Sequence, residues 1–353
     1  MDKRIGLTVS GTIPADLQAA VAAQRRPRVD YVVLADRLGA DLIDYGEARR
    51  RAGRFANLVR RFGGDNALLA WTCFTSRRHY DAILTDGEQV GIPYAALCWF
   101  ARRRSRPTHS VIVHIMSVRK KVVVFKALWL WKRIDRMFVY ATAQRDFAVE
   151  ALHMRPEHVR LTSFMVDTEF FSARHVVPNR RRMICTAGLE FRDYETLVEA
   201  VRDLDVEVVI AASSPWSKRT SDVGSAALPS NVTLCKLSLF ELRQLYADAL
   251  FVVVPLIESD FQAGVTTILE AMAMSKAVVC SHTTGQTDVI VGGETGLYVT
   301  PGDVQALRNA ICALLDSPGE QQRLGEAGHQ WVVANADIEI YAERIARAVL
   351  DVP

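Results

Sequence analysis

The chain has 353 residues, of which 50% are hydrophobic and 24% are charged. This composition is ordinary for a globular protein and excludes the collagen-like and disordered classes. At about 150 residues per domain, the length favours two domains over one. The net charge of +3 is unevenly divided, because residues 1–177 carry +12 and residues 178–353 carry −9.

No targeting or membrane-spanning segment is evident. The N-terminal sequence MDKRIGLTVSG lacks the apolar core of a signal peptide. The most apolar stretch, residues 122–131, contains Lys126 and is shorter than the ~18 to 20 residues that span a bilayer. The cysteines lack CxxC spacing, so we expect reduced thiols in a cytoplasmic protein and neither a zinc site nor a disulfide framework. They are Cys73, Cys98, Cys185, Cys235, Cys280 and Cys312.

Short apolar or β-branched runs alternate with helical patterns along the first half. We expect strands at residues 5–11, 30–36, 66–72, 80–86, 110–116 and 137–142. This alternation predicts a parallel, doubly wound sheet, in which ligands bind beyond the carboxyl ends of the strands.

A basic block lies within this first half. Residues 101–136 contain eleven Lys and Arg residues and one acidic residue, Asp135. Aromatic residues are interleaved with these bases, a composition typical of a segment that lies on an anionic membrane surface. The candidate membrane contacts are Arg103, Arg104, Lys120, Lys121, Trp129 and Trp131. A solvated basic helix face is the alternative, and part of the segment must pack on the sheet.

The second half repeats the strand–helix alternation. Strands are expected at residues 183–188, 206–212, 231–237, 249–255 and 277–282, with helices at 193–204, 238–248 and 266–274. Residues 172–182 have no clear periodicity and form the predicted linker. We therefore expect one Rossmann-like domain over residues 1–175 and a second over 176–335. A final helix within 336–353 is expected to pack back toward the first domain.

Common nucleotide and hydrolase motifs are missing from the sequence. It has no GxxxxGK[ST] loop, no GxGxxG after the first strand and no GxSxG elbow, which weakens kinase, dehydrogenase and hydrolase interpretations. Instead, a strand near residue 254 leads into an acidic loop and then a helix that begins near Ala263 to Thr266. Small residues at a helix N-terminus let a diphosphate approach the backbone N–H groups. Glu270, one turn further along, can bind ribose hydroxyls.

This segment resembles the retaining GT-B glycosyltransferases of glycosyltransferase family 4. Glu270-Ala271-Met272-Ala273 matches the second half of the family's acidic signature, and Val166-Asp167-Thr168 with Phe170 resembles its interdomain element. Ala187-Gly188 resembles its strand-end glycine, and the likeness covers most of residues 110–335. The resemblance implies a GT-B fold of two Rossmann-like domains and retaining, metal-independent transfer of a hexose from a nucleotide diphosphate sugar, with UDP favoured. No cofactor is implied beyond this co-substrate.

The resemblance also implies a donor site. Its expected residues are Gly188, Arg192, Lys218, Ala263, Gly264, Val265, Thr266, Thr267 and Glu270. Gln262 stands where the family has its first Glu, and it can hydrogen-bond a sugar hydroxyl but carries no charge. Glu258 and Asp260 lie nearby in the sequence. Leu189 replaces the family's Arg after the glycine, so Arg192 and either Lys218 or Arg219 are the candidate phosphate ligands.

The first domain is expected to bind the acceptor. His114 follows an apolar strand and corresponds to the family's histidine that contacts the transferred sugar, so it joins Arg192 and Gln262 as a candidate catalytic residue. Gly11, Asp86 and Glu88 follow other strands and are candidate acceptor contacts, although an Asp-Gly turn needs no ligand to explain it.

The acceptor itself is left open by the sequence. The basic, tryptophan-bearing segment favours a membrane lipid or lipid-linked glycan, and a peripheral location on the inner face of the membrane. A soluble enzyme that glycosylates small molecules or natural products is one alternative. Another is a catalytically degenerate GT-B protein that binds membranes or partners, and a nucleotide-sugar epimerase is a third. Nucleic acid is not expected as a partner, because no recognition module is present and the second half is acidic.

Overall fold

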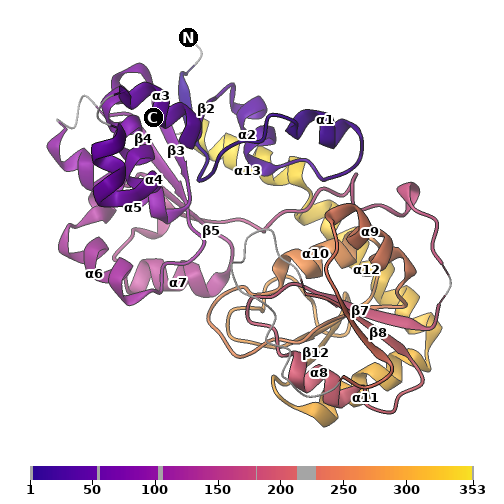
Figure 1. The fold of residues 1–353 in the computed structure, drawn as a ribbon. Helices are drawn as coiled ribbons and strands as arrows, with labels where there is room; N and C mark the ends of the chain where they lie inside the picture. Colours follow the sequence, from indigo (N-terminus) through magenta and orange to yellow (C-terminus); the bar gives the residue numbers. More distant parts are fainter. Residues whose placement is uncertain (1–2, 54–55, 102–105, 180, 213–227, 352–353) are drawn as a thin grey trace. The chain divides into compact units, whose positions relative to one another are not determined.

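The computed structural model describes the chain except for residues 1–2, 54–55, 102–105, 180, 213–227 and 352–353 (Figure 1). The described chain forms two compact units. The first consists of Met1–Ala19, Val29–Thr162 and Tyr341–Pro353, and the second of Ala20–Arg28 and Ser163–Ile340. Residues 163–175 thus group with the second unit, and the last residues of the chain with the first.

The first unit contains a parallel sheet of six strands in the order β2-β1-β3-β4-β5-β6. The strands are β1 (Ile5–Thr8), β2 (Asp41–Ile43), β3 (Ala82–Asp86), β4 (Thr108–Ile112), β5 (Arg136–Val139) and β6 (Val159–Leu161). The helices are α2 (Asp30–Leu38), α3 (Tyr45–Ala52), α4 (Ala56–Ser76, broken at Gly64), α5 (Glu88–Leu97), α6 (Arg119–Ala127) and α7 (Thr142–Glu150). Short 3₁₀ turns follow at η2 (Arg77–His79), η3 (Cys98–Phe100), η5 (Leu130–Lys132) and η6 (Pro156–His158).

Two segments expected as strands are helices instead. Residues 30–36 lie in α2, which buries Val33, Leu34 and Leu38 at helical spacing and ends at Gly39 in the left-handed conformation. Residues 66–72 lie in α4, where Leu68, Leu69, Thr72 and Cys73 are buried, again at helical spacing. Both predictions were wrong because a short apolar run fits a buried strand and a buried helix face equally well.

The second unit contains another parallel six-stranded sheet, ordered β12-β11-β10-β7-β8-β9. Its strands are β7 (Met183–Ala187), β8 (Glu207–Ala211), β9 (Val232–Cys235), β10 (Val252–Val254), β11 (Val278–Ser281) and β12 (Leu297–Val299). Its helices are α8 (Tyr194–Ala200), α9 (Leu239–Asp248), α10 (Val265–Ala273), α11 (Val304–Leu315) and α12 (Pro318–Asn335). The 3₁₀ turn η7 (Ala173–His175) precedes β7, and α1 (Leu17–Ala22) and α13 (Ile338–Leu350) each run from one unit into the other.

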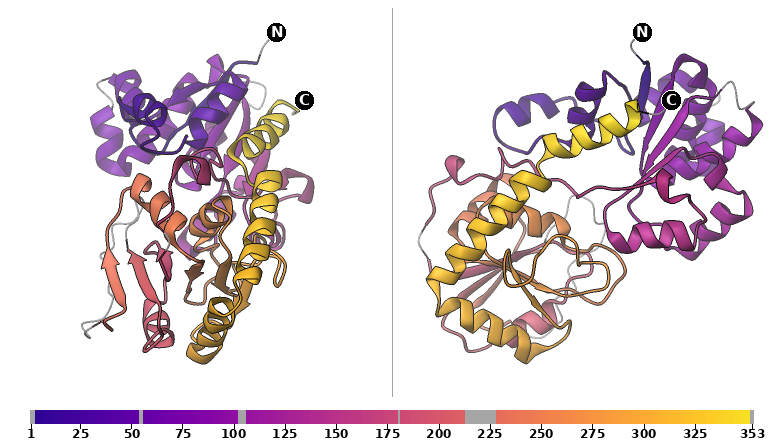
Figure 2. Two further views of the ribbon diagram at one scale, coloured as in Figure 1. Left: turned by 90° about the vertical axis from the view of Figure 1, so that its right-hand side faces the viewer. Right: turned by 180° about the vertical axis from the view of Figure 1, so that it is seen from behind.

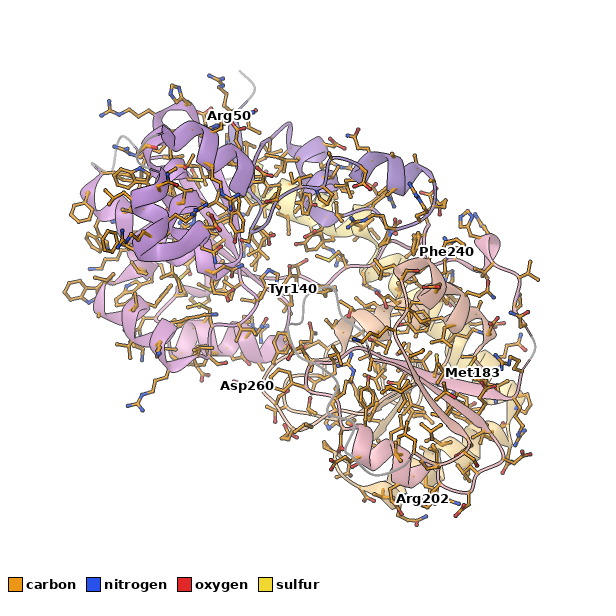
Figure 3. All side chains as sticks on the ribbon, viewed as in Figure 1. Arg50, Tyr140, Met183, Arg202, Phe240 and Asp260 are labelled. Carbon is orange, nitrogen blue, oxygen red and sulfur yellow. The ribbon has the colours of Figure 1, made fainter. Side chains whose placement is uncertain are left out.

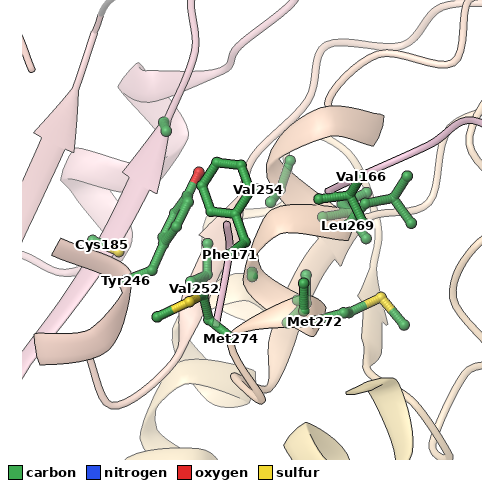
Figure 4. Close-up of a cluster of buried hydrophobic side chains, with 14 of the residues drawn as sticks. Val166, Phe171, Cys185, Tyr246, Val252, Val254, Leu269, Met272 and Met274 are labelled. Carbon is green, nitrogen blue, oxygen red and sulfur yellow. The ribbon is translucent and has the colours of Figure 1, made fainter. Parts of the chain in front are cut away.

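Helices cover both faces of this second sheet (Figures 1 and 2). Alternate residues of a strand therefore enter different cores. Cys185 and Val252 belong to the core with α9, α10 and α12, whereas Ile184 and Val253 belong to the core with α8 and α11. Figure 4 shows the first of these cores. Burial on both faces explains why these strands are continuous apolar runs, and all five expected here are present.

The predicted interdomain element, residues 166–170, forms hydrogen bonds with distant parts of the second unit. The backbone N–H of Val166 donates to Ala336 at 2.9 Å. The buried carboxylate of Asp167 accepts from the backbone N–H of Arg28 at 2.8 Å and from its guanidinium at 2.9 and 3.1 Å. These bonds tie residues 20–28 to this unit.

The closing residues of the chain are anchored on the first unit. In α13, Tyr341 shares a hydrogen bond of 3.1 Å with Tyr140, and Glu343 pairs with Arg37 at 3.1 Å. In the described part of the chain, no helix has the length and apolar character needed to cross a membrane.

Candidate functional site

The residue before helix α10 is a glycine in a backbone conformation that other residues rarely adopt. Gly264 caps the helix in the left-handed conformation at φ +76°, and a Cβ there would lie 2.7 Å from Val254. The N–H groups of the next residues, Val265, Thr266 and Thr267, point out of the first turn without helical acceptors. The positive end of the helix dipole lies at the same place, so this turn is suited to an anion such as a diphosphate.

Arg192 lies beside this turn. Its guanidinium donates to the carbonyls of Ala187 and Glu190, each at 2.9 Å, and to the Thr267 hydroxyl at 3.1 Å. A Cβ on Gly188 would lie 2.4 Å from the Arg192 Nη2, so the glycine makes room for the guanidinium. The structure thus brings Gly188, Arg192 and the start of α10 together, although they are far apart in the sequence.

Glu270 lies on the same face of α10 as Thr266 and Thr267, because it follows them at helical spacing. It is half-buried, and the phenol of Tyr246 on α9 donates to its Oε2 at 2.8 Å. Burial raises the pKa of this carboxyl to about 7, opposed by the Tyr246 hydrogen bond and the charge of Arg192. Sequence reasoning missed Tyr246, because no motif in the sequence connects it with Glu270.

The loop before α10 is tightly packed. Gln262 and Ala263 are 3% and 1% exposed, so Gln262 lies inside the loop. The Ala263 carbonyl accepts from Gln286 at 2.8 Å, and a Cβ on Gly285 would lie 2.4 Å from the Phe261 carbonyl oxygen. This close approach requires glycine at position 285.

The neighbouring loop acids differ in their surroundings. Glu258 accepts from the backbone N–H of Thr284 at 2.9 Å, so it braces two loops against each other. Asp260, labelled in Figure 3, is exposed. Lys218 and Arg219, the other phosphate candidates, lie outside the described residues, as do Arg103 and Arg104. No group of three His, Cys, Asp or Glu side chains within the described ranges is placed to hold a metal ion.

In the first unit, the candidate catalytic residue His114 lies with the candidate acceptor contacts Asp86 and Glu88 at the carboxyl ends of β3 and β4. His114 Nε2 lies 3.4 Å from Asp86 Oδ1, and its backbone N–H donates to Glu88 at 2.9 Å. Burial acts to lower the pKa of His114, but the hydrogen bond to Asp86 and the surrounding carboxylates outweigh it and raise the pKa. Glu88 is buried and pairs with Lys121 at 2.6 Å, so it holds the loop in place.

Asp30 is a further member of this cluster that sequence reasoning missed. Burial, together with the charge of Asp86, raises the pKa of the Asp30 carboxyl to about 7. Tyr140, labelled in Figure 3, has its ring 5.6 Å from that of His114. Asp30 begins α2, a segment expected to be a strand, so no pattern in the sequence connected it with His114.

Gly11 shows no crowding of the kind found at Gly264. Its N–H donates to Val9 at 2.8 Å, its carbonyl accepts from Tyr45 at 2.9 Å, and nothing lies within 4 Å of the place where a Cβ would be. The fold itself therefore does not require glycine at this position.

In the basic block, residues 101–136, some side chains lie in the core and others at the surface. Trp131 packs partly buried against the core, and Lys121 is held by Glu88. Trp129 is 55% exposed and Lys120 is exposed. Sequence reasoning missed two aromatic residues of η3, Trp99 and Phe100, which are 37% and 85% exposed.

A hydrogen bond joins η3 to the end of α6. The indole of Trp99 donates to the Leu128 carbonyl at 2.7 Å, and the Arg133 guanidinium lies 4.2 Å from the Trp99 ring centroid. We call Trp99, Phe100, Leu128 and Trp129 the aromatic patch. The side chains of all four residues are exposed.

Comparison with known proteins identifies a matching family and two relatives. Residues 180–317 match the family described as glycosyl transferases group 1. The MMP alpha-(1->4)-mannosyltransferase of Mycolicibacterium hassiacum is 31% identical over 235 residues, which are 61% of this chain and 56% of that protein. A glycogen synthase of Mycobacterium tuberculosis is 32% identical over 82 residues, 23% of this chain and 20% of that one. The chain therefore spans about half of the first relative and a fifth of the second.

Solved structures extend the likeness to both units. HepE of Anabaena, solved in complex with UDP-glucose, matches 99% of this chain and 100% of its own with a TM-score of 0.72 and 14% identity. Sucrose-phosphate synthase of Thermosynechococcus elongatus matches 98% of each chain with a TM-score of 0.70 and 17% identity. The fold is that of the GT-B glycosyltransferases, as the sequence predicted.

Proposed function

We propose that this protein is a retaining glycosyltransferase that moves a hexose from a nucleotide diphosphate sugar, with UDP favoured, to a hydroxyl acceptor. The start of α10 carries the proposal. There, the N–H groups of the first helical turn, the Arg192 guanidinium bonded to Thr267 and the Glu270 carboxylate one turn further along lie close together. An anion site followed by a carboxylate suits a diphosphate followed by a ribose.

The proposed chemistry needs no protein nucleophile. The acceptor oxygen bonds to the anomeric carbon on the face from which the diphosphate departs, and the departing phosphate oxygen takes the acceptor's proton. The N–H groups of α10 and Arg192 stabilise the negative charge that develops on the diphosphate. Glu270 holds the ribose, and Gln262 is the proposed contact of the transferred sugar in this unit. Positioning and fixed charge then supply the rate enhancement.

Transfer and its stereochemistry can be measured together. The protein is incubated with UDP-, GDP- and ADP-hexoses labelled with ¹³C in the sugar, together with vesicles of bacterial polar lipid or with soluble glycosides. The proposal predicts donor-dependent product in the anomeric configuration of the donor, and a loss of at least tenfold in Glu270→Gln. A product of opposite configuration would contradict retention, and nucleotide binding without any product would favour the degenerate, non-catalytic alternative.

For the acceptor, we propose a lipid at an anionic membrane surface. The aromatic patch combines exposed indole and phenyl rings with exposed Arg119, Lys120, Lys126 and Lys132 on the same segment. Aromatic rings partition into the interfacial zone of a bilayer, and Lys and Arg residues near it attract anionic headgroups. A solvated basic helix face would need no such rings.

Vesicle flotation tests this surface. Binding is expected to vesicles that contain phosphatidylglycerol, to be weak with phosphatidylcholine alone, and to fall several-fold in the double variant Phe100→Ser, Trp129→Ser. Phe62→Ser is the matched control, because Phe62 is 82% exposed on α4, outside the patch. Equal binding by the double variant and the control would count against a membrane role, and transfer to soluble glycosides alone would then indicate a small-molecule glycosyltransferase.

A further inference from the structure

We propose that Tyr246 is a positioning residue that holds the Glu270 carboxylate ionised and directed at the nucleotide ribose. The inference rests on the donor site proposed above and adds a residue from a different helix to it. It concerns how Glu270 remains able to accept hydrogen bonds although it is partly removed from water.

Tyr246 is a buried tyrosine whose hydroxyl is bonded to the Glu270 carboxylate. The side chain is fully buried (0% exposed), and its ring lies 6.2 Å from that of Phe171 in the core shown in Figure 4. Its hydroxyl donates to Glu270 Oε2 at 2.8 Å. A buried phenol needs such a partner, and a bond to one carboxylate oxygen fixes the plane of the group and leaves the other oxygen for a ligand.

The groups that face Glu270 act in opposite directions. Burial disfavours its charged form, whereas the Tyr246 hydroxyl and the Arg192 guanidinium favour it. Tyr246 also faces Cys185 on β7, a buried thiol whose own pKa is raised by burial. Since the Tyr246 bond stabilises the carboxylate, its removal must raise the pKa of Glu270 from about 7 and leave more of the residue protonated at neutral pH.

The test is the pH dependence of donor binding in Tyr246→Phe, which keeps the ring and removes the hydroxyl. Affinity is measured by calorimetry between pH 6 and 9 with UDP-glucose, or with the nucleotide sugar that binds best, because its doubly esterified diphosphate does not titrate in this range. Wild-type affinity is expected to fall as the pH drops through about 7. In the variant, this midpoint moves upward, and affinity at pH 7 falls about tenfold or more, the effect of losing one hydrogen bond to a charged group.

Two controls separate positioning from packing. Glu270→Gln is expected to abolish the pH dependence, and Tyr298→Phe, which alters another partly buried tyrosine of this unit, is expected to leave the midpoint unchanged. A titration without ligand tests the same prediction even where a variant binds the nucleotide sugar poorly. The side-chain carboxyl ¹³C signal assigned to Glu270, by its loss in Glu270→Gln, should titrate at higher pH in Tyr246→Phe than in wild type.

The outcomes are distinguishable. An unchanged midpoint in Tyr246→Phe, in binding and in the ¹³C titration, would overturn the role of Tyr246 and leave the donor site standing. If wild type binds no nucleotide sugar at any pH, the proposed function and this inference both fail.

Discussion

His109 shows how burial fixes the protonation state of a single residue. Its ring is fully buried, with Nε2 3.0 Å from the Thr85 hydroxyl and Nδ1 3.3 Å from the Arg133 carbonyl. A carbonyl only accepts, so Nδ1 carries the proton and Nε2 accepts from Thr85. Burial lowers the pKa of this ring to about 4, despite the opposing charge of Asp135.

This protonation state predicts a pH-dependent stability. An unfolded histidine has a pKa of about 6.5, so between pH 6.5 and 4 the unfolded chain binds more protons than the folded one. The free energy of unfolding should therefore fall as the pH is lowered through this window, by up to about 1.4 kcal/mol per pH unit from this residue. Urea unfolding of wild type and His109→Gln tests it: the stability advantage of wild type should shrink toward pH 4, and parallel profiles would contradict the assignment.

The sequence predicted the position of a single residue where that residue belongs to a short local motif. Gly264 and Glu270 lie in one short motif, and their spacing alone places them at the start and on one face of a helix. Tyr246 and Asp30 act through residues on other elements, so only the folded chain shows their partners. Lys121, a candidate membrane contact, pairs with Glu88, a partner that a charge count does not show.

At the scale of elements, the start of α10 depends on a backbone shape that glycine alone adopts freely. Gly264→Ala places a Cβ at φ +76° and 2.7 Å from Val254, so the free energy of unfolding should fall by about 1–3 kcal/mol. Gly319→Ala is the matched control, since Gly319 lies in α12 with nothing within 4 Å and should change stability little. Urea denaturation of both variants measures this, and equal stabilities would show that the turn is not strained by a side chain.

Strands and helices were predictable to different degrees in the two sheets. In the second unit, strands with both faces buried appear as continuous apolar runs bounded by turns, and all five expected ones are present. In the first unit, residues 30–36 and 66–72 are equally apolar but form helices, because their buried side chains recur every three or four residues. Short strands such as β2 and β6 were missed, since three residues carry too little pattern.

At the scale of the whole molecule, charge and chemistry divide between the two halves of the sequence. The basic first half carries the His114 cluster and the aromatic patch, and the acidic second half carries the anion site at α10. A net negative half that binds a diphosphate must do so through local groups. Helix N–H groups and Arg192 are the proposed groups, so the proposed donor site does not depend on the overall charge.

The central claim is that the second unit binds a nucleotide sugar at α10. The most direct test is the melting temperature of the protein with UDP, GDP, ADP and their hexoses, repeated with Glu270→Ala and with Glu326→Ala, an exposed glutamate of α12, as the matched control. A ligand at about 100 times its Kd stabilises by about 2.7 kcal/mol, a shift of several degrees. We predict a rise that is selective for one nucleotide, lost in Glu270→Ala and kept in Glu326→Ala. No rise with any nucleotide would contradict the account.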